Sequence, residues 1–250
     1  MRFGSLFSGI GGLDLGLERA GHQVAWQVEI DPFCRRVLAK HWPGVPCYED
    51  VKNVGAHNLA PIDLICGGFP CQDISFAGKG GGLSGARSGL WVEFARIIRE
   101  LEPRYILVEN VAALLSRGMG EILGTLASFG YDAEWSVVSA CSLGAPHSRE
   151  RLFLLAYATS ERCPSAIRGH FGAEAAVWPE EGEWGEDITE LPNRVQVATP
   201  ARGEGGGAWL RERGVLGMVD GLPEELDAIR TLGNAVVPQV AELIGRRLPL

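Results

Sequence analysis

The chain has 250 residues, of which 46% are hydrophobic and 22% charged, values typical of one large globular domain or of one domain with a small companion. It carries 23 Lys and Arg against 31 Asp and Glu, a formal net charge of −8. This balance argues against binding to nucleic acid through overall positive charge, although it leaves room for a local basic groove.

The sequence also disfavours membrane, secreted and metal-binding proteins. The longest run without Asp, Glu, Lys or Arg, residues 135–148, has 14 residues, too few to cross a bilayer. Glycines and Asp14 interrupt the first apolar run, so we expect no signal peptide. The six cysteines include no Cys-x-x-Cys pair, which favours reduced thiols, no metal site and a cytoplasmic location.

In chain order, short apolar runs alternate with helical patterns. The predicted strands are residues 3–7, 24–30, 62–69, 105–111, 135–140 and 152–158. They are apolar along most of their length, as is typical of buried parallel strands. Asp31 and Pro32 predict the start of a helix ending near His41, and residues 90–101 carry an amphipathic pattern. The alternation predicts a doubly wound, Rossmann-like α/β sheet.

The pattern changes after residue 158. Residues 159–225 are rich in Gly, Pro, Glu and Trp and show no long periodicity, which predicts a small, irregular second domain. Residues 226–250 become regular again, with an amphipathic helix expected over 238–248. We therefore expect residues 1–158 and 226–250 to form one domain and residues 159–225 another.

A glycine-rich turn, residues 7–13, follows the first predicted strand. Glycines at such a turn let backbone amides approach a ligand. The strict dinucleotide spacing fails because Asp14 occupies the last glycine position, so the turn fits an uncharged or cationic part of a nucleoside better than a phosphate. Glu29 ends the second strand and is suited to accept hydrogen bonds from ribose hydroxyls. A plain tight turn beside a surface acid is the alternative.

Cys71 stands in the second motif, Gly-Gly-Phe-Pro-Cys-Gln, at the end of the third predicted strand. The carboxyl ends of parallel strands face the ligand in open α/β sheets, so this cysteine is placed as a nucleophile. A buried structural cysteine is the alternative, and we favour it for the other five. The glycine-rich stretch that follows includes Lys79 and Arg87 and is expected to be able to close over a substrate.

Two further motifs also lie at strand ends. Glu109 and Asn110 end the fourth predicted strand, where a carboxylate either caps a helix or hydrogen-bonds a substrate. Arg149 and Arg151 precede the last predicted strand and, two apart on an extended chain, point the same way. They either contact a phosphate and a base or form a solvated charge run.

The order of these motifs resembles that of the DNA (cytosine-5-) methyltransferases. It runs Phe-Ser-Gly-Ile-Gly-Gly, Glu-Ile-Asp, Asp-Val, Gly-Phe-Pro-Cys-Gln, Glu-Asn-Val, Arg-x-Arg and Gly-Asn-Ala-Val-Val-Pro. The resemblance covers residues 1–158 and about 215–250, and the local style is similar to short bacterial and phage members. It implies transfer of a methyl group from S-adenosylmethionine to carbon 5 of a cytosine flipped out of duplex DNA.

The resemblance also implies roles for individual residues. Cys71 would attack carbon 6 of the cytosine, Glu109 would hydrogen-bond ring nitrogen 3, and Asn110 would hold the strand end. Arg151 would bind the 2-carbonyl oxygen, and Arg149 would support the catalytic loop. The implied cofactor residues are Phe7, Gly9, Ile10, Gly11, Glu29, Ile30, Asp50, Val51, Pro70, Leu90, Asn234 and Val236.

For DNA, the expected contacts are Gln72, Ser75, Lys79, Arg87, Arg194, Arg202, Arg211 and Arg213. Residues 159–225, the implied target-recognition domain, hold 6 basic and 13 acidic side chains, and we expect their acidic stretch, residues 174–190, to face away from DNA. The implied partners are double-stranded DNA and, genetically, a cognate restriction endonuclease; we expect a monomer. The alternatives are a non-catalytic relative that binds DNA or cofactor, and a methyltransferase acting on a small molecule.

Overall fold

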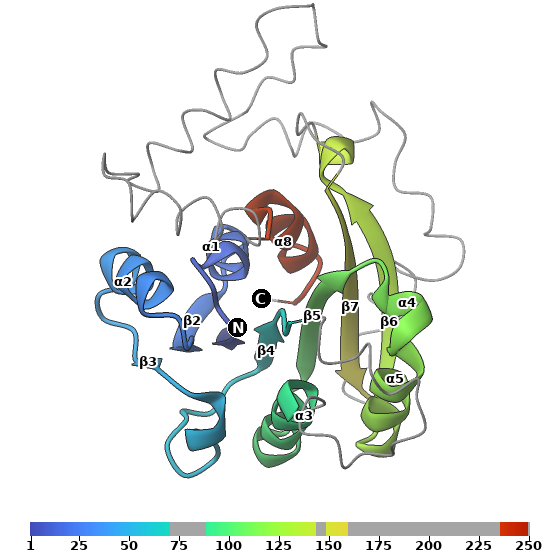
Figure 1. Cartoon of the computed structure of the whole chain (residues 1–250), viewed down its shortest axis with the longest axis horizontal. Coiled ribbons are helices and arrows are strands. Elements are labelled where there is room, and N and C mark those ends of the chain that lie inside the picture. Colours follow the sequence, from blue (N-terminus) through green and yellow to red (C-terminus); the bar gives the residue numbers. More distant parts are fainter. Residues whose placement is uncertain (71–88, 144–148, 160–235, 250) are drawn as a thin grey trace, which may run out of the picture.

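The computed structural model describes residues 1–70, 89–143, 149–159 and 236–249 (Figure 1). These ranges include all six predicted strands and three helices that the sequence pattern indicated. Cys71, the glycine-rich stretch after it and nearly all of the predicted second domain lie outside the described residues.

A seven-stranded sheet with the order β3-β2-β1-β4-β5-β7-β6 forms the centre of the fold. Its strands are β1 (Arg2–Leu6), β2 (Gln23–Val28), β3 (Cys47–Tyr48), β4 (Leu64–Gly67), β5 (Tyr105–Val111), β6 (Tyr131–Ser139) and β7 (Glu150–Ala158). Strands β3, β2, β1, β4 and β5 are parallel to one another. The predicted Rossmann-like α/β class is therefore confirmed.

The last two strands differ from the parallel arrangement that the apolar runs suggested. β7 pairs antiparallel with both β5 and β6. β6 is an edge strand in which only Tyr131 and Val138 are buried, and Trp135 is 43% exposed. It also begins four residues earlier than predicted, because Asp132 and Glu134 interrupt the apolar run at its start.

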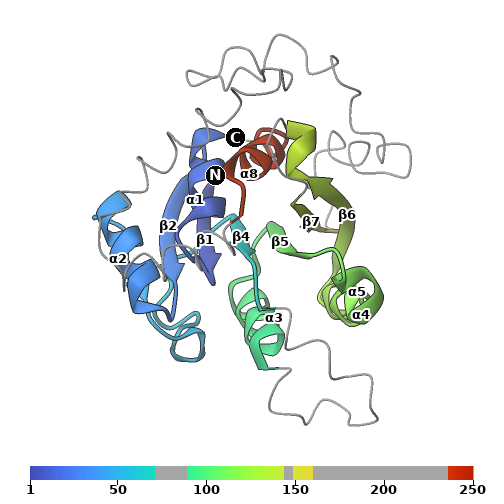
Figure 2. The ribbon, with the colours of Figure 1, turned by 45° about the horizontal axis from the view of Figure 1, so that its top comes forward.

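Helices cover both faces of the sheet, as Figures 1 and 2 show. α1 (Gly12–Arg19) and α8 (Pro238–Gly245) bury apolar side chains in one hydrophobic cluster on one face. α3 (Gly89–Leu101), α4 (Leu114–Arg117) and α5 (Met119–Ser128) contribute to a second cluster on the other face. The two clusters make the sheet a central layer with helices on both faces.

Local sequence explains where several of these helices begin. α2 (Pro32–His41) starts as predicted: the Asp31 carboxylate accepts hydrogen bonds from the amides of Phe33 and Cys34, and Pro32 occupies the first turn. α3 carries its apolar side chains at the predicted spacing. α8 ends at Gly245, three residues before the predicted end.

No helix within the described residues is long and apolar enough to cross a membrane.

Candidate functional site

The carboxyl ends of the neighbouring parallel strands β2, β1, β4 and β5 lie side by side at one end of the sheet (Figure 2). β1 lies between β2 and β4, so the strand order reverses there, and α/β folds bind ligands at such a reversal. The glycine-rich turn follows β1, Glu29 follows β2, Gly68 follows β4, and Glu109 lies near the end of β5. The topology thus brings these described parts of four predicted motifs to the same end of the strands.

The turn after β1 contains backbone conformations that residues with side chains rarely adopt. Phe7 has φ 54°, and Gly9 and Gly11 have φ 56° and 86°. A positive φ at Phe7 is strained for a residue with a side chain, and such strain is common at functional sites. The Phe7 ring stacks on Phe94 of α3, with ring centres 6.3 Å apart, so α3 packing holds the strained residue.

Glu29 ties this turn to the end of β2. One of its carboxylate oxygens accepts the Gly9 amide at 2.7 Å and the other accepts the Asp31 amide at 2.8 Å. A carboxylate offers about four acceptor sites, so both oxygens keep capacity for a further donor. The neighbouring Ile30 side chain is 66% exposed, which is unusual for an isoleucine and leaves an apolar surface beside the acid.

The remaining described cofactor candidates flank this end of the sheet. Asp50 caps a short 3-10 helix, η1 (Val51–Asn53), by accepting the Lys52 amide at 2.9 Å. Leu90 lies in the first turn of α3. Val236 packs so closely on Gly12 that a Cβ there would lie 2.5 Å from the Val236 carbonyl oxygen, which brings the segment before α8 to the glycine-rich turn.

Glu109 and Arg151 form an ion pair across β5 and β7. In the antiparallel register, Glu109 lies opposite Phe153 and Val111 lies opposite Arg151, so the two charged side chains are diagonal neighbours on one face of the sheet. The Arg151 Nε atom is 3.1 Å from the Glu109 carboxylate. The other carboxylate oxygen lies against Gly68, where a Cβ would approach it to 2.5 Å. The carboxylate is therefore held from two sides.

Burial raises the pKa of Glu109 from 4.5 to about 7, against the opposing effect of Arg151 and Arg149. Desolvation disfavours the charged carboxylate, while the two cations favour it. The group is therefore poised between its protonated and ionised forms near neutral pH. A carboxyl that can both donate and release a proton at this pH is suited to general acid–base chemistry.

Asn110 fixes the backbone that leads to the predicted nucleophile. Its side-chain amide donates to the Phe69 carbonyl at 3.0 Å, and its side-chain oxygen accepts the Val111 amide at 2.9 Å. Because Asn110 is 4% exposed, this bridge between β5 and the end of β4 is shielded from water. Pro70 follows at the surface, and Cys71 comes directly after it.

Several predicted site residues lie outside the described residues, so their placement stays a prediction: Cys71, Gln72, Ser75, Lys79, Arg87, Arg194, Arg202, Arg211, Arg213 and Asn234. Within the part of the chain that the structure describes, no three His, Cys, Asp or Glu side chains are grouped so that they could hold a metal ion.

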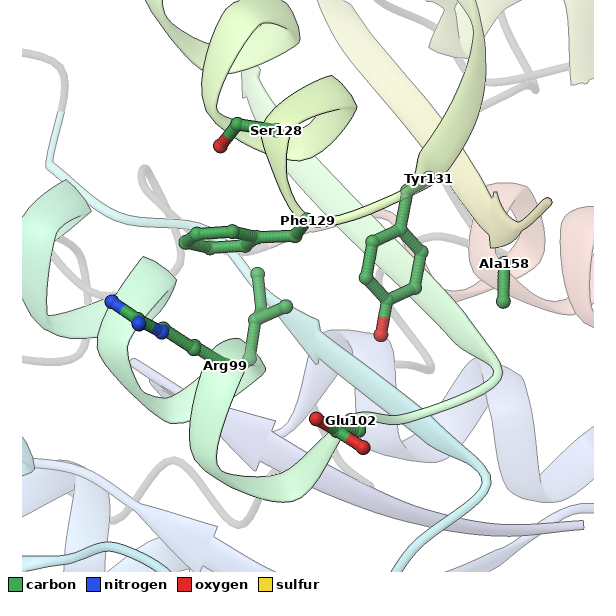
Figure 3. A pocket seen from close by; sticks show the side chains of 7 residues that line it. Arg99, Glu102, Ser128, Phe129, Tyr131 and Ala158 are labelled. Atoms are coloured by element: carbon green, nitrogen blue, oxygen red, sulfur yellow. The ribbon is translucent and has the colours of Figure 1, made fainter. Parts of the chain in front are cut away.

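A separate pocket of about 450 Å³ lies at the opposite end of the sheet, near the amino end of β5 and the carboxyl end of β7 (Figure 3). Its walls come from the end of α3, the end of α5, the start of β6 and the end of β7. Tyr131 lines it and donates to the Pro103 carbonyl at 2.7 Å. Because Glu109 and Arg151 lie at the other ends of β5 and β7, this pocket is not part of the candidate site.

Comparison with known protein families decides the chain's relationship. Residues 1–199 match the family model described as C-5 cytosine-specific DNA methylase. The chain belongs to the C-5 cytosine-specific DNA methylase family. This methylase chain is 39% identical over 164 residues to the Type II methyltransferase M2.BsuMI of Bacillus subtilis, a match that covers 62% of the chain and 42% of the relative.

Two further proteins also match parts of the chain. It is 34% identical over 172 residues to the Type II methyltransferase M.AquIA of a Picosynechococcus species, covering 60% of the chain and 69% of that protein. A solved structure of an E. coli prophage protein, assigned as a DNA modification methyltransferase, is 32% identical with a TM-score of 0.54, over 64% of the chain and 47% of that structure. The methylase thus spans about half the length of many relatives it matches.

Sequence reasoning missed two arginines of this methylase that hold the backbone of the candidate site. Arg35 on α2 donates to the carbonyls of Glu29 and Ile30, at 3.2 and 2.9 Å, and pairs with Glu49. Arg96 on α3 donates to two carbonyls around η1. Their spacing from acidic residues resembles ordinary surface ion pairs, so only their backbone partners distinguish them.

Proposed function

We propose that this chain methylates carbon 5 of a flipped cytosine in double-stranded DNA, with S-adenosylmethionine as methyl donor and Cys71 as nucleophile. The observation that carries the proposal is the 3.1 Å ion pair between buried Glu109 and half-buried Arg151, with Asn110 holding the backbone just before Pro70 and Cys71. A proton-sharing acid beside a cysteine-bearing segment suits addition to a pyrimidine ring.

The residues present fit the adenosine part of the proposed cofactor. The Glu29 carboxylate keeps acceptor capacity for ribose hydroxyls, the exposed Ile30 side chain offers an apolar surface for a purine ring, and a Cβ at Gly9 would meet nothing within 4 Å. When bound, S-adenosylmethionine supplies an electrophilic methyl group. The chain's residues orient it, and the glycine-rich turn gives it close access to the backbone.

The proposed chemistry begins with the Cys71 thiolate, which forms a bond to carbon 6 of the cytosine. Electron density then shifts toward nitrogen 3 and carbon 5, and protonated Glu109 donates a hydrogen bond to nitrogen 3. Carbon 5 would take the methyl group, leaving S-adenosylhomocysteine. The carbon 5 proton would then leave to a base, and the carbon 6–sulfur bond would break to restore the thiolate. Arg151 binds the 2-carbonyl oxygen and keeps Glu109 in position.

Duplex DNA containing 5-fluorocytosine tests the proposal. Fluorine at carbon 5 cannot leave as a proton, so the elimination stops and the enzyme stays bound to carbon 6. We expect a denaturation-resistant adduct with the full chain and cofactor, and none with Cys71→Ser, which should still bind cofactor. Cofactor binding without any adduct on mixed-sequence DNA would favour a non-catalytic relative. Methyl transfer to small molecules alone would favour the third alternative.

The wider role is also part of the proposal. We assign DNA recognition to residues 159–225 and catalysis to residues 1–158 with 226–250. The relatives named Type II methyltransferases support a role beside a cognate restriction endonuclease. We further propose that the enzyme acts in the cytoplasm and as a monomer. Bisulfite sequencing of DNA from a methylation-free host that expresses the gene reports activity and target sequence together. Unmethylated host DNA, with soluble protein present, would contradict the proposal.

A further inference from the structure

Arg96 makes four hydrogen bonds, two of which join helix α3 to the loop after β3. Its Nη2 atom donates to the carbonyls of Val51 and Val54, at 3.0 and 2.9 Å. Its Nε and Nη1 atoms donate to Glu93 and Glu100, both at 2.7 Å. The guanidinium group is planar and rigid. Here the two carboxylates of α3 fix its orientation, and its remaining nitrogen donates to the loop.

The loop needs such a tie because η1 is a single short turn. A 3-10 helix of three residues, Val51–Asn53, leaves nearly all its backbone groups without partners inside the turn. The Asp50 carboxylate satisfies an amide at its start, and Arg96 satisfies carbonyls at and just after it. The turn is therefore held by hydrogen bonds from α3 in addition to the burial of Val51 and Val54 in the hydrophobic core.

Glu100 adds a second tie between the same two elements. One of its carboxylate oxygens accepts the Ala56 amide at 2.9 Å, and the other accepts Arg96. Glu100 also lies directly against Gly55, where a side chain would displace it. Arg96 and Glu100 together therefore fix residues 51–56 against α3, the helix that begins with Gly89 and Leu90 beside the candidate site.

We propose that Arg96 is a positioning residue for recognition of the purine ring of the cofactor. The inference rests on the proposed function, and it assigns Asp50 and Val51, two of the implied cofactor residues, to the amino edge of the adenine. Arg96 does not touch the purine. It holds the Val51 carbonyl and thereby sets where Asp50 and Val51 present their polar groups. Without it, Val51 and Val54 stay buried in the core, but their carbonyls lose the hydrogen bonds to α3 that fix the orientation of the turn.

The test compares two ligands that differ only at the purine amino edge. S-adenosylhomocysteine and S-inosylhomocysteine share the ribose and the amino acid, but the second has an oxygen where adenine has its amino group. Their affinities for the full chain, measured by calorimetry, give a discrimination ratio. We expect Arg96→Gln to lower this ratio by about tenfold, because one poorly placed hydrogen bond has about that effect on affinity.

Two variants keep the result interpretable. Arg96→Lys retains the charge beside Glu93 and Glu100 but cannot reach both loop carbonyls, so we expect an intermediate ratio. Arg99→Gln removes the same charge from an exposed position three residues along α3, and we expect the wild-type ratio. A general loss of stability in Arg96→Gln would weaken both ligands equally and leave the ratio unchanged.

The outcomes separate this inference from the function on which it rests. If the wild type binds S-adenosylhomocysteine while both Arg96 variants keep a discrimination ratio within twofold of the wild-type ratio, the role of Arg96 is overturned and the proposed function stands. Failure of the wild type to bind either ligand overturns the proposed function and this role together. Amide hydrogen exchange provides a readout without ligand: residues 51–56 should exchange faster in Arg96→Gln than in Arg99→Gln, and equal rates would also contradict the inference.

Discussion

Replacing Glu109 by glutamine removes one buried ionisable group and leaves its shape. Burial raises its pKa from 4.5 to about 7, so between these values the folded chain holds a proton that the unfolded chain has lost. The wild-type free energy of unfolding therefore falls as pH rises through this window. Each pKa unit corresponds to about 1.4 kcal/mol, so Glu109→Gln should gain on the order of 3 kcal/mol over wild type between pH 4.5 and 8.

Urea unfolding of both proteins at half-unit steps of pH measures this difference. Asp14 is a second buried carboxyl, and burial raises its pKa to about 6 against hydrogen bonds from Gln27 and Ser5. Its contribution to the pH dependence has the same sign and is present in both proteins, so it cancels in the difference. Asp14→Asn serves as the control, because it should flatten the lower part of the wild-type curve and leave the effect of Glu109 intact.

A difference that stays constant from pH 4.5 to 8 would refute the reasoning about Glu109. The same pKa has a consequence for activity. Methyl transfer by the wild type should fall above pH 7 as Glu109 ionises, and Glu109→Gln should be slower by about 100-fold and lack this limb, because glutamine donates a hydrogen bond but cannot exchange a proton. Initial rates across the pH range check both statements.

Three other substitutions test the candidate site. Gly68→Ala places a Cβ against the Glu109 carboxylate and should lower the initial rate of methylation at least tenfold. Gly44→Ala, at a position with open space around it, should leave the rate unchanged. Equal effects of the two substitutions would contradict the packing argument. Asn110→Ala leaves a buried carbonyl without its donor and should cost about 1–3 kcal/mol in urea unfolding; no loss would show that water replaces the amide. Ile30→Ala changes an exposed side chain, so stability should stay within about 0.5 kcal/mol while affinity for S-adenosylhomocysteine, measured by calorimetry, falls; unchanged affinity would remove this residue from the proposed cofactor surface.

The sequence predicted the central strands well because they are buried on both faces. β5 was predicted to the residue, and the Asp31 cap marked the start of α2. α5 escaped prediction because Gly120 and Gly124 interrupt its helical pattern. Strand direction was also beyond reach: an apolar run such as β7 has the same composition in a parallel or an antiparallel pair, and only its partners decide.

The candidate site was predictable where a motif names the residue and unpredictable where a backbone atom is the partner. Glu109 was expected from its motif, but its contact with Gly68 depends on the register of β4 and β5. The role of Arg96 depends on carbonyls more than forty residues earlier in the chain. Carbonyl groups are present at every residue, so no sequence pattern distinguishes the ones that a side chain will reach.

The packing of α8 on α1 has a consequence for how the chain is made. Gly16 leaves no room for a side chain against Ala241, and His22 donates to the Gly245 carbonyl across 223 residues of sequence. At 5–20 residues per second, a ribosome adds α8 roughly 11 to 45 seconds after α1. Throughout that interval the nascent chain exposes the apolar side of α1, and contacts so distant in sequence close slowly. A chain released before α8 is made would therefore lack the partner of this side of α1.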